Sequence, residues 1–182
     1  MSGRAIFLDR DGVVNKVIFR KGTPSSPRTV DEFELEADAH KSISRLKAAG
    51  FKIFVVSNQP DLARGHLTRA ALDAMTRTVL ATLPVDGVRI CPHDDDDACS
   101  CRKPKPGMLI DLARENRLVL SQSFMIGDSW KDSTAAARAG CRSIILDRPY
   151  NQNAHADLRV TDLGQAADVV LEERLSDDGR PE

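Results

Sequence analysis

The chain has 182 residues with 26 basic and 27 acidic side chains, a length that suits one domain with its own hydrophobic core. The resulting net charge of −1 supplies no overall electrostatic field to attract nucleic acid or an anionic membrane surface. We expect a single domain over residues 1–176 with a frayed tail at 177–182, a monomer, and neither a nucleic-acid nor a membrane partner.

The first residues and the cysteines bear on the compartment. A strand-like run begins at Ala5, which leaves no room for the basic and apolar regions of a signal peptide. No apolar stretch approaches the roughly 20 residues that cross a bilayer. Three of the four cysteines, Cys91, Cys99 and Cys101, lie close together, which suits a metal site in a reducing compartment better than a disulfide framework. We therefore expect a soluble, cytoplasmic protein.

Short apolar runs alternate with longer amphipathic stretches along the chain. In chain order the sequence predicts a strand at 5–9, a loop at 16–33, a helix at 37–50, a strand at 52–58, a helix at 68–83, a strand at 87–91, a helix at 106–118, a strand at 123–128, a helix at 131–140, a strand at 143–147 and a helix at 162–175. The predicted strands are almost continuously hydrophobic, as in a parallel sheet covered on both faces.

This alternation predicts an α/β fold, a doubly wound, Rossmann-like parallel sheet with helices on both faces. Ligands of such folds bind beyond the carboxyl ends of the strands. The chain is too short for a separate cap domain, so we expect loops 16–33, 59–67 and 91–106 to shape the entrance to any pocket.

Two acids follow the first strand in the stretch "FLDRDGVVN". Residues i and i+2 of an extended chain point to the same side, so Asp9 and Asp11 can face one pocket, and Gly12 lets the chain turn away. A solvated Asp-Gly turn is the simplest alternative. A helix-loop-helix calcium site fails, because its sixth and twelfth positions, counted from Asp9, hold Val14 and Arg20 rather than Gly and Glu.

Other polar residues also stand at predicted strand ends. Asp128 in "IGDSWKD" can share a Mg2+ ion with the first pair of acids, because Mg2+ prefers oxygen ligands. A carboxylate can attack phosphorus to form an aspartyl-phosphate, and a neighbouring carboxyl can transfer the proton. Ser57 and Asn58 can donate to phosphate oxygens, although such a pair is also common as a simple turn or cap. The segment "CRKPKPG" places Arg102 and Lys103 where a cation can neutralise a phosphoryl group, although loop cations are often only solvated.

The stretch "CPHDDDDACSC" at 91–101 brings together Cys91, His93, Cys99 and Cys101. Four thiolate and imidazole ligands are typical of tetrahedral structural zinc, which leaves no open position for chemistry. The alternative is three unrelated cysteines and a loop histidine. Because the region is poor in apolar residues, we expect a zinc ion to hold this loop.

The ordered set of "DRDG" at 9–12, "SN" at 57–58, Lys103 in "CRKPKPG" and "GDSWKD" at 127–132 resembles the haloacid dehalogenase superfamily of phosphohydrolases. The resemblance covers roughly residues 4–175. It implies that Asp9 is the nucleophile and Asp11 the general acid and base, and that Asp9, the main-chain carbonyl of Asp11 and Asp128 bind Mg2+.

The same resemblance implies contacts to the substrate and a role for the metal-binding loop. Ser57 and Lys103 would hold the phosphoryl group, and Asn58 and Arg102 would contact substrate. Asp132 would orient Lys103 or a metal-bound water, or else be an exposed acid in the first turn of a helix. Structural zinc would fix the loop that delivers Arg102 and Lys103.

"SNQPDLARG", "CPH" and "CSCRKPKPGM" resemble a small group within this family that acts on heptose bisphosphates and histidinol phosphate. The favoured reaction is Mg2+-dependent removal of the 7-phosphate of D-glycero-D-manno-heptose 1,7-bisphosphate, a step toward nucleotide-activated heptose. Histidinol phosphate is the alternative substrate, and Pro60-Asp61 departs from the group's usual Ser-Gly. Arg20, Lys21, Arg28 and Arg64 are available to meet a second phosphate.

Two hypotheses of a different class stay open on the sequence. A non-catalytic zinc-loop module would bind protein or nucleic acid, although the acidic run at 94–97 and the single Trp and Tyr argue against a nucleic-acid surface. A phospho-acceptor regulatory domain would use the strand-end acids but would not need the zinc loop. Phosphate release in the presence of Mg2+ separates an enzyme from both.

Overall fold

A computed structural model describes residues 3–178 of the chain, and its centre is a six-stranded parallel sheet. The strand order across the sheet is β5-β4-β1-β6-β7-β8. The strands are β1 (Ala5–Leu8), β4 (Lys52–Asn58), β5 (Gly87–Cys91), β6 (Phe124–Gly127), β7 (Arg142–Leu146) and β8 (Leu158–Val160). This order confirms the predicted doubly wound sheet.

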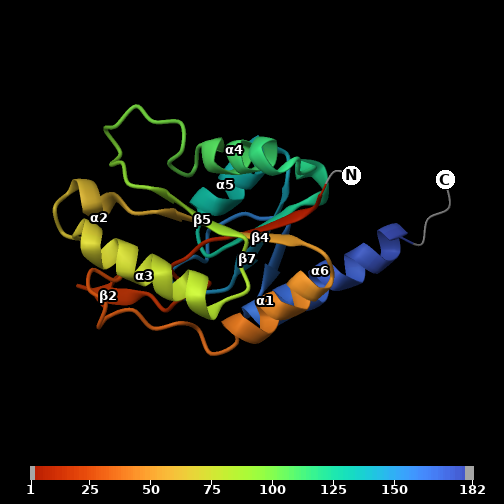
Figure 1. The fold of residues 1–182 in the computed structure, drawn as a ribbon, viewed down its shortest axis with the longest axis horizontal. Coiled ribbons are helices and arrows are strands. Elements are labelled where there is room, and N and C mark those ends of the chain that lie inside the picture. Colours follow the sequence, from red (N-terminus) through yellow and green to blue (C-terminus); the bar gives the residue numbers. More distant parts are fainter. Residues whose placement is uncertain (1–2, 179–182) are drawn as a thin grey trace.

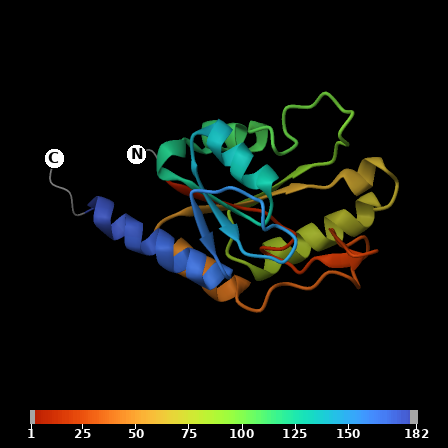
Figure 2. The same ribbon diagram turned by 180° about the vertical axis from the view of Figure 1, so that it is seen from behind.

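Helices cover both faces of the sheet (Figures 1 and 2). One face packs against α1, α3 and α6, and the other against α4 and α5. The helices are α1 (Ala39–Ala48), α2 (Pro60–Ala63), α3 (Arg69–Thr82), α4 (Gly107–Asn116), α5 (Trp130–Ala139) and α6 (Leu163–Asp178), with a 3-10 turn, η1 (Leu120–Gln122), before β6. The sheet is therefore covered on both sides.

The central strand β1 explains why the apolar runs are continuous. Ile6 and Leu8 point into the core with α1 and α6, whereas Ala5 and Phe7 point into the core with α4 and α5. All four side chains are fully buried. Because successive strand residues face opposite sides, a strand between two helical layers needs apolar residues at every position.

The register of the sheet brings the predicted polar residues to one edge. Leu8 of β1 pairs with Val55 of β4 on one side and with Ile126 of β6 on the other. Asp9 and Asp128 follow their strands directly, and Asn58 ends β4. Parallel pairing therefore places the three at the carboxyl edge of the sheet, as the fold class predicts.

The segment 16–33 was expected to be only a loop, and this was wrong in part. It carries a two-stranded antiparallel hairpin, β2 (Ile18–Arg20) and β3 (Thr23–Ser25), which stands apart from the main sheet. Lys21 and Gly22 form the turn with positive φ, a conformation that glycine adopts without steric cost. The hairpin is a short flap and not a cap domain.

Three short elements, α2, η1 and β8, were also not predicted, since none is long enough to show a periodicity. The frayed tail expected at 177–182 falls mostly outside the described residues. α6 continues through 177 and 178, and residues 179–182 are not described.

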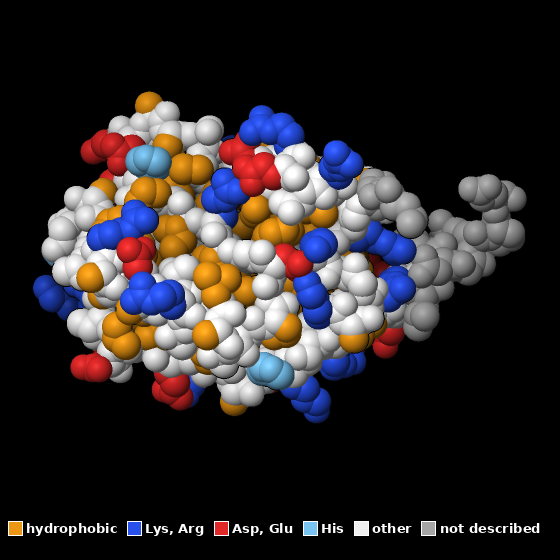
Figure 3. All heavy atoms as spheres, in the orientation of Figure 1, with side chains coloured by type: hydrophobic (Ala, Val, Ile, Leu, Met, Phe, Trp, Pro, Cys, Tyr) orange, Lys and Arg blue, Asp and Glu red, His pale blue; other side chains and the backbone are white. Residues whose placement is uncertain are grey.

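On the face drawn in Figure 3, basic and acidic side chains are interspersed, in keeping with the near-neutral net charge. Among the described residues no helix has the length and apolar composition that a membrane crossing requires.

Candidate active site

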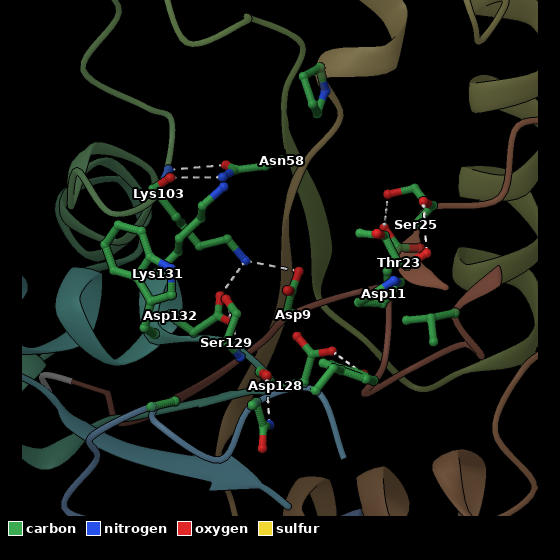
Figure 4. Close-up of a pocket in the computed structure, with 18 of the residues that line it drawn as sticks. Asp9, Asp11, Thr23, Ser25, Asn58, Lys103, Asp128, Ser129, Lys131 and Asp132 are labelled. Carbon is green, nitrogen blue, oxygen red and sulfur yellow. Dashed lines mark hydrogen bonds and ion pairs between the residues drawn. The ribbon is translucent and has the colours of Figure 1, made fainter. Parts of the chain in front are cut away.

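A pocket of about 890 Å3 opens beyond the carboxyl ends of β1, β4 and β6 (Figure 4). It draws residues from the two strand-end acidic motifs, the flap, the loops around α2 and before α4, the start of α5 and the loop after β7. Among them are Asp9, Asp11, Ser26, Arg28, Asn58, Asp61, Arg64, Arg102, Lys103, Asp128, Trp130, Lys131, Asp132, Tyr150 and Asn151. Residues far apart in the sequence thus share one cavity.

Asp9 lies at the centre of the site. Its Oδ1 accepts a hydrogen bond from the backbone N–H of Arg10 at 2.7 Å and forms an ion pair with Lys103 Nζ at 2.8 Å. Burial and the neighbouring Asp132 and Asp128 raise the pKa of Asp9 well above its ordinary value, against the opposing effect of Lys103. The carboxylate is held in place by two donors to one oxygen.

Lys103 is almost completely buried, with 2% of its side chain exposed. Its Nζ donates to the carbonyl of Val56 at 2.8 Å and lies 2.7 Å from Asp132 Oδ1 as well as 2.8 Å from Asp9. Burial opposes the charged form, but Asp132 and Asp9 outweigh it and raise the pKa of the ammonium above its ordinary value. Lys103 is therefore a fixed positive charge that touches two acids (Figure 4).

Asp132 is not the exposed first-turn acid that the sequence left as an alternative. It lies in the first turn of α5 but is fully buried. Its Oδ2 accepts from the backbone N–H of Ser129 at 3.0 Å and from the Ser129 hydroxyl at 2.7 Å, while Oδ1 faces Lys103. Asp132 both caps the helix and orients the lysine.

Asp128 has no basic partner of its own among the described residues. Its Oδ2 accepts a hydrogen bond from the Tyr150 hydroxyl at 2.5 Å, and its main-chain carbonyl accepts from Asn151 at 2.7 Å. Burial and Asp132 raise the pKa of Asp128 to about 7. A Cβ on Gly12 would lie 2.1 Å from Asp128 Oδ2, so only glycine allows this approach.

The acids fit a divalent cation. Carboxylate oxygens of Asp9, Asp128 and Asp132 lie within 4.8 Å of one another and share one ammonium, that of Lys103. If all three acids were ionised, three negative charges would face the single positive charge of Lys103 in a largely buried site. Such an excess of negative charge is energetically costly without a further cation. An all-oxygen donor set of this kind is the one Mg2+ prefers.

Asp11 sits on the flap side of the site and accepts hydrogen bonds from four side chains. Arg10 donates through Nε at 3.1 Å and Nη2 at 3.0 Å, Asn15 at 3.0 Å, Ser26 at 2.8 Å and Gln59 at 2.7 Å. Burial favours the neutral acid, but Arg10 and the other donors outweigh it and lower the pKa of Asp11. In this arrangement Asp11 is held as an ionised carboxylate.

The two residues at the end of β4 make internal contacts. Ser57 is 1% exposed, and its hydroxyl accepts from Gln59 Nε2 at 2.9 Å. Asn58 lines the pocket, yet its amide donates to the Lys103 carbonyl at 2.9 Å and accepts from the Lys103 N–H at 3.0 Å. Asn58 therefore braces the backbone of the segment that carries the lysine. Their expected phosphate and substrate contacts stay predictions.

The pocket arginines are each matched by a carboxylate. Arg28 pairs with Asp61 at 2.7 Å, and Arg64 pairs with Asp94 at 2.5 Å. Arg102, only 8% exposed, pairs with Asp95 at 2.9 Å. Arg20, also proposed to meet a second phosphate, pairs with Glu32. Lys131 is the one cation among the described pocket residues for which no ion pair is found.

The Cys/His cluster is assembled as a four-ligand group. The Sγ atom of Cys91 lies 3.1 Å from that of Cys101, 3.8 Å from that of Cys99 and 3.5 Å from His93 Nδ1. Tetrahedral zinc with bonds of about 2.0–2.3 Å places neighbouring ligand atoms about 3.5–3.8 Å apart. Two of the three distances fall in this range and the third is shorter, so the four side chains are gathered closely enough for one zinc ion to draw them into its tetrahedron. The cluster lies directly before Arg102 and Lys103.

Sequence reasoning missed Gln59, Tyr150 and Asn151. Gln59 is fully buried and joins Ser57 to Asp11 through one amide nitrogen. Asn151 bridges the carbonyls of Asp128 and Leu146, each at 2.7 Å. A polar residue directly after "SN" was a weak signal for Gln59. Nothing near Tyr150 in the sequence indicated that its loop returns to the acidic motif.

Comparisons with known proteins agree with this geometry. A family model described as HAD-hydrolase-like matches residues 100–170. A D-glycero-beta-D-manno-heptose-1,7-bisphosphate 7-phosphatase from Bordetella bronchiseptica is 38% identical over 76% of this chain and 77% of its own length. One of the same name from Helicobacter pylori strain J99 is 30% identical over 93% of this chain and 98% of its own length.

Solved structures point the same way. The crystal structure of D,D-heptose 1,7-bisphosphate phosphatase from B. bronchiseptica, complexed with magnesium and phosphate, has a TM-score of 0.80. It is 33% identical and covers 93% of this chain and 99% of its own. A putative HAD-like phosphatase from Mesorhizobium loti has a TM-score of 0.76 at 28% identity, over 93% of this chain and 86% of its own. The resemblance inferred from the motifs is confirmed.

Proposed function

We propose a specific phosphatase reaction for the chain, which belongs to the haloacid dehalogenase-like phosphatase family that includes the D-glycero-D-manno-heptose 1,7-bisphosphate 7-phosphatases. The reaction is Mg2+-dependent hydrolysis of the 7-phosphate of that heptose bisphosphate through an aspartyl-phosphate. The relatives support this substrate over histidinol phosphate, and they are named for the β anomer. The product would serve nucleotide-activated heptose biosynthesis in the cytoplasm.

One observation carries the proposal. Asp9, Lys103, Asp128 and Asp132 come from three separate parts of the sequence, and their charged atoms converge within one pocket. Paired acids, a buried ammonium and an open cavity are what phosphoryl transfer requires, because that chemistry is mostly positioning and charge stabilisation. One chain supplies all of these groups, so a monomer suffices.

Asp9, Asp128 and the main-chain carbonyl of Asp11 would hold Mg2+, and Asp132 stands beside them with its Oδ1 on Lys103. When bound, the ion would neutralise phosphoryl oxygens and draw the raised pKa of the acids downward so that Asp9 stays ionised.

In the first step a carboxylate oxygen of Asp9 forms a bond to phosphorus while the bond from phosphorus to the sugar oxygen breaks. Arg10 N–H and Lys103 both contact Oδ1, so Oδ2 is the oxygen less occupied by donors and is suited to attack. Lys103 would offset the charge on the phosphoryl oxygens. The departing sugar oxygen takes a proton from Asp11.

In the second step water attacks the phosphorus of the aspartyl-phosphate, Asp11 accepts the proton of that water, and the Asp9 carboxylate leaves. The four donors around Asp11 keep it ionised, which is the form that can accept the proton once some of these hydrogen bonds are released. Donation in the first step requires the protonated carboxyl to exchange some of these hydrogen bonds for one to the substrate. Ser26 links this exchange to the base of the flap.

The second phosphate of the substrate needs a cation that is not already neutralised. Arg28, Arg64 and Arg102 are each held by an aspartate in an ion pair, whereas Lys131 lines the pocket without an ion pair among the described residues. Its longer-range charge only adds to the effect of Arg102 in lowering the pKa of Asp95. Lys131 stands next to the exposed Trp130 in the first turn of α5, on the same flank of Asp9 as Lys103 in Figure 4. We place the anomeric phosphate at Lys131.

The Cys91, His93, Cys99 and Cys101 cluster would hold a structural zinc ion. Burial, with Cys101, raises the pKa of the Cys91 thiol to about 12, so a cation is what would keep it as a thiolate. With four protein ligands no position is left for substrate. The ion would instead fix the loop whose Arg102 and Lys103 enter the pocket.

Phosphate release tests the proposal directly. Purified protein with Mg2+ would be assayed on the β and α anomers of the heptose 1,7-bisphosphate, on heptose 7-phosphate and on histidinol phosphate. We expect the highest kcat/KM on the β bisphosphate. Faster turnover of histidinol phosphate would make that compound the substrate in place of the heptose bisphosphate. Absence of phosphate release from all four compounds would favour a non-catalytic binding module.

A further inference from the structure

The loop between β7 and β8 is built around the acidic edge of the sheet, although the motifs did not draw attention to it. Three hydrogen bonds join this loop to the two acidic motifs. Arg148 Nη2 donates to the Gly12 carbonyl at 2.9 Å, Tyr150 donates to Asp128 Oδ2 at 2.5 Å, and Asn151 donates to the Asp128 carbonyl at 2.7 Å. The loop therefore fastens the ends of β1 and β6 to each other.

Tyr150 makes the contact that matters for chemistry. Its ring lines the pocket, and its hydroxyl occupies one carboxylate oxygen of Asp128. Among the described residues this is the one side-chain hydrogen bond to the Asp128 carboxylate, whereas Asp9, Asp11 and Asp132 each have at least one nitrogen donor. The orientation of Asp128 therefore depends on Tyr150.

The hydrogen bond between Tyr150 and Asp128 is closely packed by neighbouring residues. A Cβ on Gly12 would lie 2.1 Å from Asp128 Oδ2 and 2.9 Å from the Tyr150 oxygen, so the turn of the first motif closes over the pair. The Tyr150 ring also meets Phe19 of the flap edge-on, with centroids 6.1 Å apart. The close approach of Gly12 is the contact that limits the rotation of the tyrosine hydroxyl and the carboxylate.

We propose that Tyr150 is a positioning residue that holds the Asp128 carboxylate in the orientation for binding the divalent cation, with its hydroxyl on Oδ2 and Oδ1 left for the metal. The inference rests on the proposed function, because it takes Asp128 as a metal ligand. Partners that orient a metal ligand typically contribute about 10- to 100-fold to metal affinity.

The test is direct titration of the purified protein with Mn2+, a spectroscopic substitute for Mg2+, with free ion measured by electron paramagnetic resonance. Tyr150→Phe removes the hydroxyl and keeps the ring, and Asp128→Asn identifies the signal that belongs to this site. Phe19→Ala is the matched control, because it removes the ring contact and leaves the hydroxyl. We expect the Kd for Mn2+ to rise about tenfold or more in Tyr150→Phe and to change less than about twofold in Phe19→Ala.

Each outcome is decisive. An unchanged or tighter Mn2+ Kd in a folded Tyr150→Phe protein would overturn the positioning role. So would a Tyr150→Phe protein that has lost its fold without metal, because the hydroxyl would then serve stability instead. If the wild-type chain itself binds no Mn2+ and releases no phosphate, the proposed function fails and the inference falls with it. Metal binding in the wild type with no effect of Tyr150→Phe rejects the inference alone.

Discussion

The strand-end acids and the Cys/His cluster are both candidate metal centres, yet they are assembled in different ways. The Cys/His group comes from one short stretch, residues 91–101, which is the last residue of β5 and the loop after it, and its ligand atoms lie within 4.8 Å of one another. The acidic group needs the ends of β1 and β6, the start of α5 and Lys103, so it exists only once the sheet has formed. In the proposed function the local cluster supports its loop, whereas the long-range cluster carries the chemistry and depends on the whole fold.

Loss of the proposed nucleophile should give the largest effect. Asp9→Asn keeps the size of the side chain and removes the attacking carboxylate, so we expect phosphate release to fall by about 10³-fold or more. The thermal unfolding midpoint should stay the same or rise, because one of three crowded acids is neutralised. Initial rates and calorimetry on the same preparation would check both. Turnover of Asp9→Asn near the wild-type rate would show that Asp9 is not the nucleophile.

The next largest effect is expected for Lys103→Met, which should lower both the rate of phosphate release and the free energy of unfolding. Asp9 and Asp132 would lose the ammonium that lies 2.8 and 2.7 Å from them. Removing one partner of a buried ion pair costs about 3–5 kcal/mol, so unfolding in urea should show a loss of that order. We expect kcat to fall at least about 100-fold. A variant that is inactive yet fully stable would contradict the packing described for Lys103.

Cys101→Ser should distinguish the contribution of the Cys/His cluster from that of the acidic cluster. We expect zinc content, measured by mass spectrometry, to fall from about one ion per chain toward zero. Because the loop delivers Lys103, kcat should fall about 10-fold, well short of the Asp9→Asn effect, and the unfolding midpoint should drop by several degrees. Cys141→Ser, outside the cluster, is the control. Full activity in a zinc-free variant would show that the position of Lys103 in the pocket does not depend on the zinc ion.

Lys131→Gln should report on substrate recognition without disturbing either cluster. The expected result is about a tenfold rise in KM for the heptose 1,7-bisphosphate and little change for heptose 7-phosphate, because only the former carries the second phosphate. Lys41→Gln removes an exposed lysine of α1 and controls for net charge. An equal change for both substrates would place the second phosphate elsewhere.

The smallest expected effect lies away from both clusters. Burial opposes ionisation of Asp86, but hydrogen bonds from Lys47, the Ile53 N–H and Lys52 outweigh it and lower the pKa of Asp86 below its ordinary value. A lowered pKa contributes stability above the unfolded-state pKa, and this contribution is lost as the pH falls through the folded-state value. Asp86→Asn should therefore lose about 0.5–1 kcal/mol at pH 7, since both lysines are partly exposed. In urea unfolding the difference between the two proteins should shrink below about pH 4, and a difference that persists unchanged at lower pH would refute this.

The sheet and most helices were predictable from sequence because continuous apolar runs such as Ala5–Leu8 are typical of strands buried between two helical layers. The site residues followed from the motifs at Asp9, Lys103 and Asp128, and the Cys/His spacing was informative by itself. The flap hairpin was not predictable, since Ile18–Arg20 and Thr23–Ser25 are too short and half-exposed to show an alternation.

Side-chain partners across the pocket were the other part that sequence could not supply. Asp132 has the sequence position of an ordinary first-turn acid, and only the fold reveals that Lys103 lies against it. Tyr150 lies 22 residues from Asp128, and its contact depends on the path of the loop after β7. Pairings of this kind are decided by tertiary structure, for which no local pattern exists.

Phosphoryl transfer through Asp9, at the acidic edge of the sheet, is the step on which the proposed reaction depends. It can be tested by a rapid acid quench of the wild-type protein with Mg2+ and the heptose β-1,7-bisphosphate, followed by mass spectrometry of the peptides. We predict a transient phosphoryl group on Asp9 that forms and decays at rates able to support turnover and is absent from Asp9→Asn. Turnover by the wild type with phosphate found on another residue, or formed too slowly on Asp9, would contradict this mechanism.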